Sequence, residues 1–205
     1  MAQRGRPRGF DRDQALHRAM NVFWERGYEG TSISELTAAM GIAAPSLYAA
    51  FGSKEQLFRE AVELYDSLEG AAERALDDAP TAREGIEAML REHAANYTDP
   101  DTPAGCLIVL GATAYAPENR KIAEYLAGWR RETTATFRAR LARGVQEGDV
   151  PASVDVDALA AYFNTLLEGL SIEARDGASR AQLETTIDCA MAAWAPLTAA
   201  RALPN

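Results

Sequence analysis

The chain is poor in the residues that build catalytic and metal centres. Among its 205 residues there are two cysteines and two histidines. Cys106 and Cys189 lie far apart and form neither a disulfide framework nor a zinc-finger spacing. No Asp or Glu motif sets a histidine beside a nucleophile, so the sequence predicts no enzyme, no metal site and no cofactor. A reduced, cytoplasmic setting is the simplest expectation.

Long apolar runs are also missing. No stretch reaches the roughly 18 consecutive apolar residues of a membrane span. The basic N-terminus has no apolar segment behind it, so a signal peptide is not expected either.

The chain has no excess of positive charge, because its formal net charge is −9. The distribution is uneven: residues 1–54 hold seven Lys and Arg against five acids, whereas the remainder holds 14 against 25. An acidic body behind a weakly basic head repels a polyanion everywhere except at the head.

The most informative stretch is residues 32–51, which read SISELTAAMGIAAPSLYAAF. Ser32 and Glu35 have the spacing of a capping box, and Gly41 marks a helix end. A second short helix is predicted from about residue 44, with Leu47 and Phe51 pointing inward. Two short helices joined by a tight Gly-containing turn are typical of a helix-turn-helix, although an ordinary helical corner has the same pattern.

The surrounding sequence, RGYEGTSISELTAAMGIAAPSLYAAFGSKEQLF, resembles the DNA-binding domain of TetR-family transcriptional regulators. The matching residues are Gly27, Tyr28, Thr31, Gly41, Leu47, Tyr48, Phe51, Lys54, Glu55, Leu57 and Phe58. Two residues depart from the family pattern. Thr37 is a mild change, and Ala43 removes an N-cap hydroxyl, which costs about 1 kcal/mol.

The rest of the chain also reads as helices separated by Pro- and Gly-containing loops, so an all-α fold of about nine helices is predicted. The resemblance implies a helix-turn-helix domain over residues 10–70, with the motif at about 32–51. An effector-binding and dimerisation domain follows over residues 71–205. It further implies a homodimeric, ligand-responsive repressor of a palindromic operator in double-stranded DNA.

Family positions that contact phosphates correspond here to Thr31, Ser46, Tyr48 and Lys54. Positions that face bases correspond to Ala44, Pro45, Ala49 and Ala50. With such small side chains, readout should depend on thymine methyl groups and DNA shape. The arm that contains Arg4, Arg6 and Arg8 is expected to enter a minor groove or to be a solubilising tail.

The resemblance also implies a small-molecule pocket among the helices after residue 80, and the aromatic side chains there suggest an apolar or aromatic effector. Its candidate residues are Met89, His93, Tyr97, Cys106, Leu110, Tyr115, Tyr125 and Trp129. The apolar stretch 105–115 is predicted to be a buried helix. Cys106 is either core packing or a redox- or electrophile-sensing thiol, which would make the chain a sensor of a different kind.

Two helices, predicted over about residues 155–174 and 179–194, are expected to form the dimer. Their apolar arcs are wider than one buried side requires. The candidate interface residues are Leu166, Leu167, Leu170, Ile187, Met191 and Trp194. A helical interaction protein that does not bind DNA is the competing class.

Overall fold

The computed structural model describes residues 10–199, and all regular secondary structure in that range is helical. The α-helices are α1 (Arg12–Arg26), α2 (Ile33–Met40), α3 (Ala44–Phe51), α4 (Lys54–Asp78), α5 (Ala82–Tyr97), α6 (Leu107–Leu110), α7 (Arg120–Glu147), α8 (Val156–Arg175), α9 (Arg180–Ala192) and α10 (Trp194–Thr198). A 3₁₀ turn, Pro117–Asn119, precedes α7. The predicted all-α fold is confirmed, with α10 as a short helix separate from α9.

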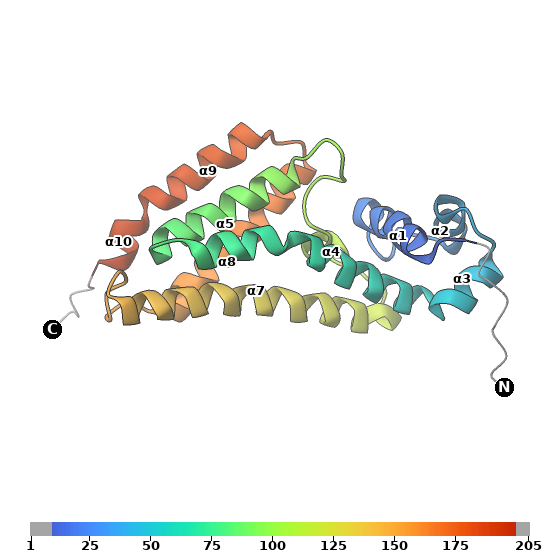
Figure 1. Ribbon diagram of the computed structural model, residues 1–205, viewed down its shortest axis with the longest axis horizontal. Coiled ribbons are helices and arrows are strands. Elements are labelled where there is room, and N and C mark those ends of the chain that lie inside the picture. Colours follow the sequence, from blue (N-terminus) through green and yellow to red (C-terminus); the bar gives the residue numbers. More distant parts are fainter. Residues whose placement is uncertain (1–9, 200–205) are drawn as a thin grey trace.

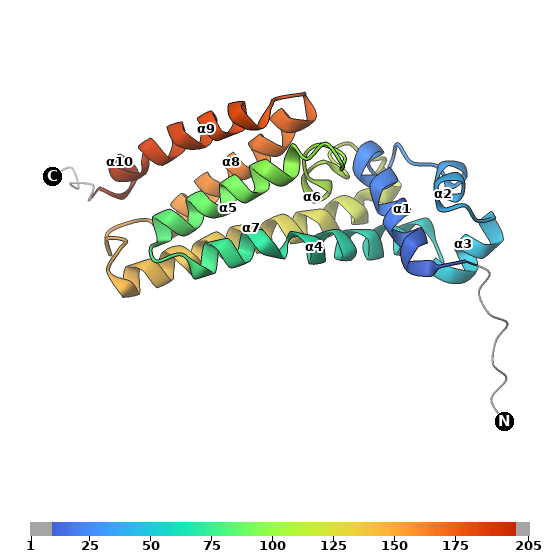
Figure 2. The same ribbon diagram turned by 45° about the horizontal axis from the view of Figure 1, so that its top comes forward.

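The helices form two lobes (Figures 1 and 2). The first three helices make a small head at one end, and α5, α7 and α8 form a long bundle with α9 along its outside. Helix α4 begins in the head and runs into the bundle, packing against both α1 and α5. The predicted boundary between residues 70 and 71 therefore falls inside one continuous helix.

The head is built from local signals. Ser32 and Glu35 form the predicted capping box, and Gly41 ends α2 in the left-handed conformation with φ of 69°. Ala43 gives α3 no side-chain cap, as its residue type predicts. Phe23, Tyr28 and Phe58 fill the centre with edge-to-face ring contacts 5.0 and 5.1 Å apart.

The predicted buried helix over residues 105–115 is wrong in extent, because only Leu107–Leu110 is helical. Backbone groups that would continue the helix are bonded elsewhere. The Ile108 carbonyl accepts from Arg130 at 2.9 Å, and the Gly111 carbonyl accepts from the Tyr28 amide of the head at 2.7 Å. This short segment is therefore tied to the head on one side and to α7 on the other.

Helix α4 ends at Asp78, and a buried arginine holds that end. Arg140 donates to the carbonyl oxygens of Leu76 at 3.3 Å and Ala79 at 3.2 Å. These are the carbonyl groups that a helix end leaves without internal partners. Leu68, on α4, is more than half exposed.

Candidate DNA-binding face and effector cavity

The outer face of α3 carries small side chains and one tyrosine. Pro45, Tyr48 and Ala49 are exposed, whereas Leu47 and Phe51 are buried in the head. Ala44, Ser46 and Ala50 are half-buried along the edges of this face. Without long side chains, the helix backbone can approach another surface closely, which is what insertion into a major groove requires.

Lys54 lies at the start of α4, next to this face. Its ammonium group is 4.2 Å from the ring centroid of Tyr28, a cation–π contact. Burial lowers the pKa of Lys54, and the nearby Glu29 and Glu35 carboxylates oppose this shift. The lysine is thus a pre-positioned cation rather than a freely moving one.

Thr31 is placed differently from the expectation. It is only 2% exposed, and its hydroxyl donates to the Gly27 carbonyl at 2.7 Å. Its side chain therefore stabilises the turn before α2 and is not presented to a phosphate. Arg4, Arg6 and Arg8 lie outside the described residues.

The bundle contains a cavity between α4, α5, α6, α7 and α8. Its free volume is about 70 Å³. Four predicted pocket residues line it together: Met89, His93, Tyr97 and Cys106.

The other four predicted pocket residues do not line this cavity. Leu110 faces Gly105 and the head side of the segment, and Tyr115 is exposed in the following loop. Tyr125 and Trp129 lie edge to face on α7, where the Tyr125 ring stacks with the Arg59 guanidinium. Helical spacing identified aromatic residues on the correct helices but not which side of α7 faces inward.

Sequence reasoning missed the contribution of α4 and α8 to the cavity and selected other residues of α7 than those that line it. The missed lining residues are Tyr65, Asp66, Glu69, Glu73, Ile108, Val109, Arg130, Thr133, Thr136, Asn164, Leu167 and Glu168. Asp66, Glu69 and Glu73 recur at helical spacing on α4, a signal that was available in the sequence but is equally typical of a solvated face.

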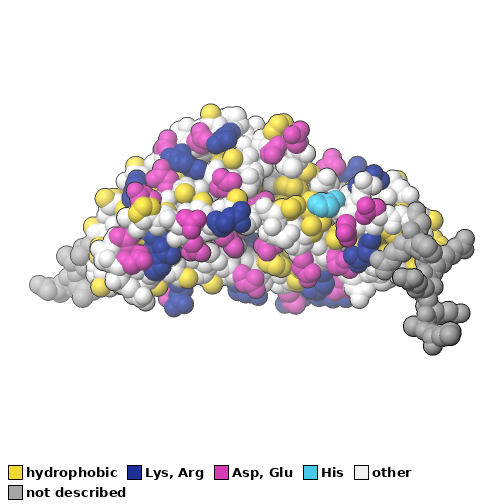
Figure 3. Space-filling view, viewed as in Figure 1, with side chains coloured by type: hydrophobic (Ala, Val, Ile, Leu, Met, Phe, Trp, Pro, Cys, Tyr) yellow, Lys and Arg dark blue, Asp and Glu magenta, His cyan; other side chains and the backbone are white. Residues whose placement is uncertain are grey.

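These residues make the lining acidic, with four carboxylates against the one guanidinium of Arg130. Burial raises the pKa of Asp66, and repulsion from Glu73, Glu132 and Glu69 raises it further. The prediction of a purely apolar or aromatic site is therefore incomplete. Figure 3 shows that acidic and basic side chains are interspersed over the viewed face of the molecule.

The cavity wall is bonded directly to the head. The Trp24 indole of α1 donates to the Gly105 carbonyl at 2.9 Å, and its ring meets Tyr65 edge to face at 4.8 Å. At the end of α8, Arg175 donates to three carbonyl oxygens, those of Trp24, Glu25 and Ala104, at 2.7–2.8 Å. One guanidinium thus joins α8, the C-terminal end of α1 and the segment that carries Cys106.

A second connection lies on the other side of the head. The Glu29 carboxylate accepts from the Ala116 amide at 2.8 Å and from Asn119 at 2.9 Å. These two hydrogen bonds lower the pKa of Glu29. Lys121 of α7 forms an ion pair with Glu55 at the start of α4.

The predicted dimer residues are mostly buried within their own chain, so this assignment is corrected. Leu167, Leu170, Ile187, Met191 and Trp194 are at most 8% exposed. Helix α8 packs against α5, α7 and α9 of the same chain, and these neighbours cover the arc that was assigned to a partner. Leu166 is half-buried, and the large apolar side chains that α8 leaves exposed are Tyr162 and Ile172.

No helix in residues 10–199 is both long enough and apolar enough to cross a bilayer. Over the same residues, no group of three or more His, Cys, Asp and Glu side chains is arranged to hold a metal ion.

Two family profiles match the chain. Residues 15–61 match "Bacterial regulatory proteins, tetR family", and residues 80–190 match "Tetracyclin repressor-like, C-terminal domain". The chain is 36% identical to the HTH-type transcriptional repressor ComR of Escherichia coli strain K12, over 95% of this chain and 93% of ComR. It is 34% identical to the HTH-type transcriptional repressor BdcR of the same organism, over 93% of this chain and 90% of BdcR.

A solved structure is similar over nearly the whole length. A cysteine mutant of the TetR family transcriptional regulator CifR, complexed with 26bp double-strand operator DNA, is 48% identical and superposes with a TM-score of 0.91. The match covers 93% of this chain and 100% of the CifR chain.

Proposed function

Because this chain belongs to the tetR family of bacterial regulatory proteins and is a transcriptional regulator, we propose that it is a homodimeric repressor released from its operator by a small molecule. The observation that carries the proposal is the exposed face of α3, in a chain 48% identical to a regulator solved on operator DNA. We assign it to the cytoplasm, where bacterial DNA lies, and infer binding without catalytic turnover.

The domain of residues 10–70, which consists of the head and the first part of α4, is the part that meets DNA. Tyr48 and Ser46 flank the face of α3 and would contact phosphates together with Lys54, fixing the register on the duplex. Pro45 and Ala49 are exposed between them and would face base edges. Small apolar groups there favour recognition through thymine methyl groups and groove shape.

The dimer would form through the outward faces of α8 and α9. Tyr162 and Ile172 are 39% and 47% exposed on α8, and Cys189 and Ala192 are exposed on α9. Pairing of these two helices with their copies gives an isologous two-fold bundle. A two-fold axis presents two heads to the two halves of a palindromic site.

The cavity would hold the effector, and the bonded contacts between its wall and α1 would carry the response. A ligand that binds one head position better than the other shifts the equilibrium by that difference in affinity. Tyr65 and the segment 104–111 both line or border the cavity and both contact Trp24. Displacing either one therefore displaces the head.

The function is tested by fluorescence anisotropy of the purified chain on duplexes that tile the DNA flanking its own gene. One duplex should bind at least about a thousandfold more tightly than a scrambled duplex of equal length and composition. Equal affinity for all duplexes would contradict the proposal.

The dimer is tested with Ile172→Glu, which places a charge on the outward face of α8. This variant should sediment as a monomer and lose operator binding while its head stays folded. Ala139→Glu, at an exposed position of α7, is the matched control and should remain dimeric. An Ile172→Glu dimer would place the interface elsewhere.

A further inference from the structure

Acidic side chains of α4 form a row along one wall of the cavity. Asp66 and Glu69 are half-buried in this wall, and Glu73, one helical turn further, is exposed. Glu168 of α8 lines the same cavity. The row on α4 therefore leads from the interior of the protein to solvent, and its charge attracts cations toward the cavity.

These four carboxylates have no ammonium or guanidinium partner in the cavity. Arg130 is the one guanidinium of the lining, and it donates to the Ile108 carbonyl at 2.9 Å. Within residues 10–199, no salt bridge joins it to any of the four. Burial, and then repulsion from neighbouring carboxylates, raise the pKa of Asp66. A positively charged ligand would relieve this repulsion.

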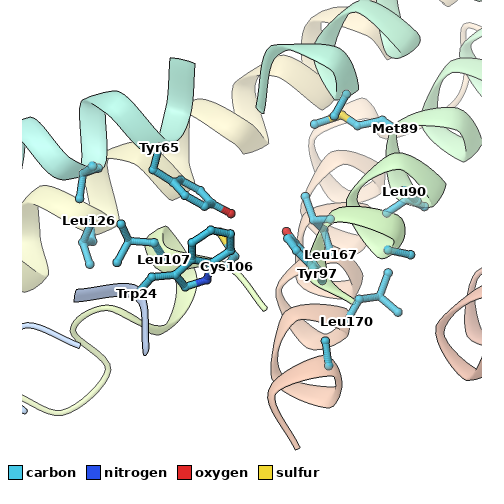
Figure 4. Packing of buried hydrophobic residues seen from close by; sticks show 14 of the residues in the cluster. Trp24, Tyr65, Met89, Leu90, Tyr97, Cys106, Leu107, Leu126, Leu167 and Leu170 are labelled. Carbon is cyan, nitrogen blue, oxygen red and sulfur yellow. The ribbon is translucent and has the colours of Figure 1, made fainter. Parts of the chain in front are cut away.

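The inner part of the cavity contains two polar atoms without partners. Tyr65 is 2% exposed, and its hydroxyl has no hydrogen-bond partner within residues 10–199. Figure 4 shows this hydroxyl directed into the space between α4 and Tyr97. Nδ1 of His93 is likewise unpaired over the same range, because its 3.2 Å contact with a Glu69 oxygen lacks the geometry of a hydrogen bond. A buried polar atom left in this state is costly unless a ligand pairs with it.

The surroundings of these atoms favour a ligand that donates hydrogen bonds. Glu69 accepts from Asn96 at 3.2 Å and Glu168 accepts from Asn164 at 2.9 Å, so both carboxylates are held in place. Ionised carboxylates accept hydrogen bonds only, each of these two keeps free lone pairs, and the oxygen of a tyrosine hydroxyl can also accept. A ligand with both a positive charge and several N–H groups would therefore satisfy the charge and the hydrogen bonds together.

We propose that the cavity binds the ammonium group of a small primary amine. The proposal deepens the effector role proposed above, on which its regulatory consequence rests. An ammonium group has three diverging N–H donors, and the acceptors here come from α4, α5 and α8. A planar guanidinium is better suited to two parallel bonds with one carboxylate. The free volume of about 70 Å³ restricts the enclosed part of the ligand to a short amine.

The bound ammonium group would act on the head through Tyr65. The ring of Tyr65 meets the Trp24 ring of α1 edge to face, with the ring centroids 4.8 Å apart. A hydrogen bond from the ligand to the Tyr65 hydroxyl restricts the position of that ring. The ligand would thereby favour one position of α1 over another, which is the difference in affinity that a switch requires.

Charge selection is tested by calorimetric titration of the full chain at constant ionic strength and pH 7. The probes are propylamine, 1-propanol and propionate, which have similar length and differ in charge, because propylamine is protonated at this pH. Propylammonium should bind with a Kd below about 1 mM, and at least about tenfold more tightly than either of the others. No binding of propylammonium, or binding no tighter than that of 1-propanol, would overturn the proposal.

The position of the site is tested with Glu69→Gln, which keeps the size of the side chain and removes its charge. This variant should bind propylammonium at least about tenfold more weakly than the wild type. Glu63→Gln is the matched control, because Glu63 is exposed on the same helix and does not line the cavity. Equal affinities of the two variants would contradict a site at Glu69.

The need for N–H donors is tested with tetramethylammonium, which has the charge but no N–H group. It should bind the wild type at least about tenfold more weakly than propylammonium does. Binding as tight as that of propylammonium would show that charge alone is recognised, and the ammonium assignment would be wrong.

The role of the Tyr65 hydroxyl is tested with Tyr65→Phe. This variant should weaken propylammonium binding at least about fivefold, because a hydrogen bond to a charged group is lost. Tyr125→Phe, which removes a hydroxyl outside the cavity, is the control and should bind normally. Unchanged affinity in Tyr65→Phe would overturn the assignment of this hydroxyl as an acceptor.

The link to DNA binding is measured separately. Saturating propylammonium should release a bound operator from the wild type, whereas sodium chloride at equal ionic strength, the control for salt, should release less. If propylammonium binds as described but the operator stays bound, the ammonium site stands and its regulatory role is wrong. If the chain without ligand binds no operator, the repressor proposal fails, and the calorimetric titrations still decide the ammonium site.

Discussion

The head and the cavity differ in how far apart in sequence their packed residues lie and in how their polar groups are paired. In the head, residues close in sequence pack against one another, and the polar groups near the turn are paired, as with Thr31 and the Gly27 carbonyl. In the cavity, residues from five helices meet, the Tyr65 hydroxyl lacks a partner within the described range, and Asp66 sits among like charges. The polar groups of this turn therefore need no bound partner. The cavity contains unfavourable interactions, the unpaired Tyr65 hydroxyl and the like charges around Asp66, which a bound molecule can relieve.

The sharpest test of this comparison is stability. Leu47→Ala empties a fully buried position in the head and should lower the free energy of unfolding by about 2–4 kcal/mol. Tyr65→Phe removes only the unpartnered hydroxyl and should change it by less than about 1 kcal/mol, in either direction. Urea unfolding followed by circular dichroism measures both. A large loss with Tyr65→Phe would mean that the hydroxyl has a structural partner.

A second test separates binding from folding within the head. Ala49→Glu places a negative charge on the exposed face of α3 and should weaken operator binding more than about a hundredfold through repulsion by phosphates. The midpoint of thermal unfolding should stay within a few degrees of the wild type, because the side chain is exposed. Ala139→Glu adds the same charge on α7 and should bind almost normally. Equal losses in both variants would indicate a general charge effect.

The smallest expected effect concerns the positioned cation of the head. Lys54→Ala should weaken binding to operator and random DNA alike by about tenfold, and reduce the slope of log affinity against log salt by about one. Arg83→Ala, on α5, removes an equal charge away from the head and is the control. A loss confined to the operator would mean that Lys54 reads sequence rather than phosphate.

How far the sequence predicts each region follows from how each is assembled. The capping box of Ser32 with Glu35, the stop at Gly41 and the inward pair Leu47 and Phe51 are all local patterns, and all are confirmed. The lining of the cavity depends on which side of each long helix faces inward. Helical spacing correctly predicted that Tyr97 lines the cavity but wrongly included Trp129. Helix α7 has apolar side chains on more than one side, so spacing alone does not identify the side that faces inward.

The dimer residues show the same limit. The apolar arc of α8 was real, but a periodic pattern states only that a face is buried and not what buries it. Leu167 and Leu170 are covered by α5, α7 and α9 of their own chain, whereas the exposed Ile172 lies outside the residues that the pattern emphasised. Only the packed structure distinguishes these two kinds of burial.

The Arg175 connection has a consequence for how such proteins can diverge. All three of its acceptors, at Trp24, Glu25 and Ala104, are backbone carbonyl oxygens, which every amino acid supplies. Side chains on either lobe can therefore change over evolutionary time without removing the joint between them. A head with a new operator preference could be exchanged onto an existing sensor body, provided that the body keeps this arginine and the head keeps the end of its first helix. The contact made by Arg175 is therefore independent of the side chains that the two connected segments carry.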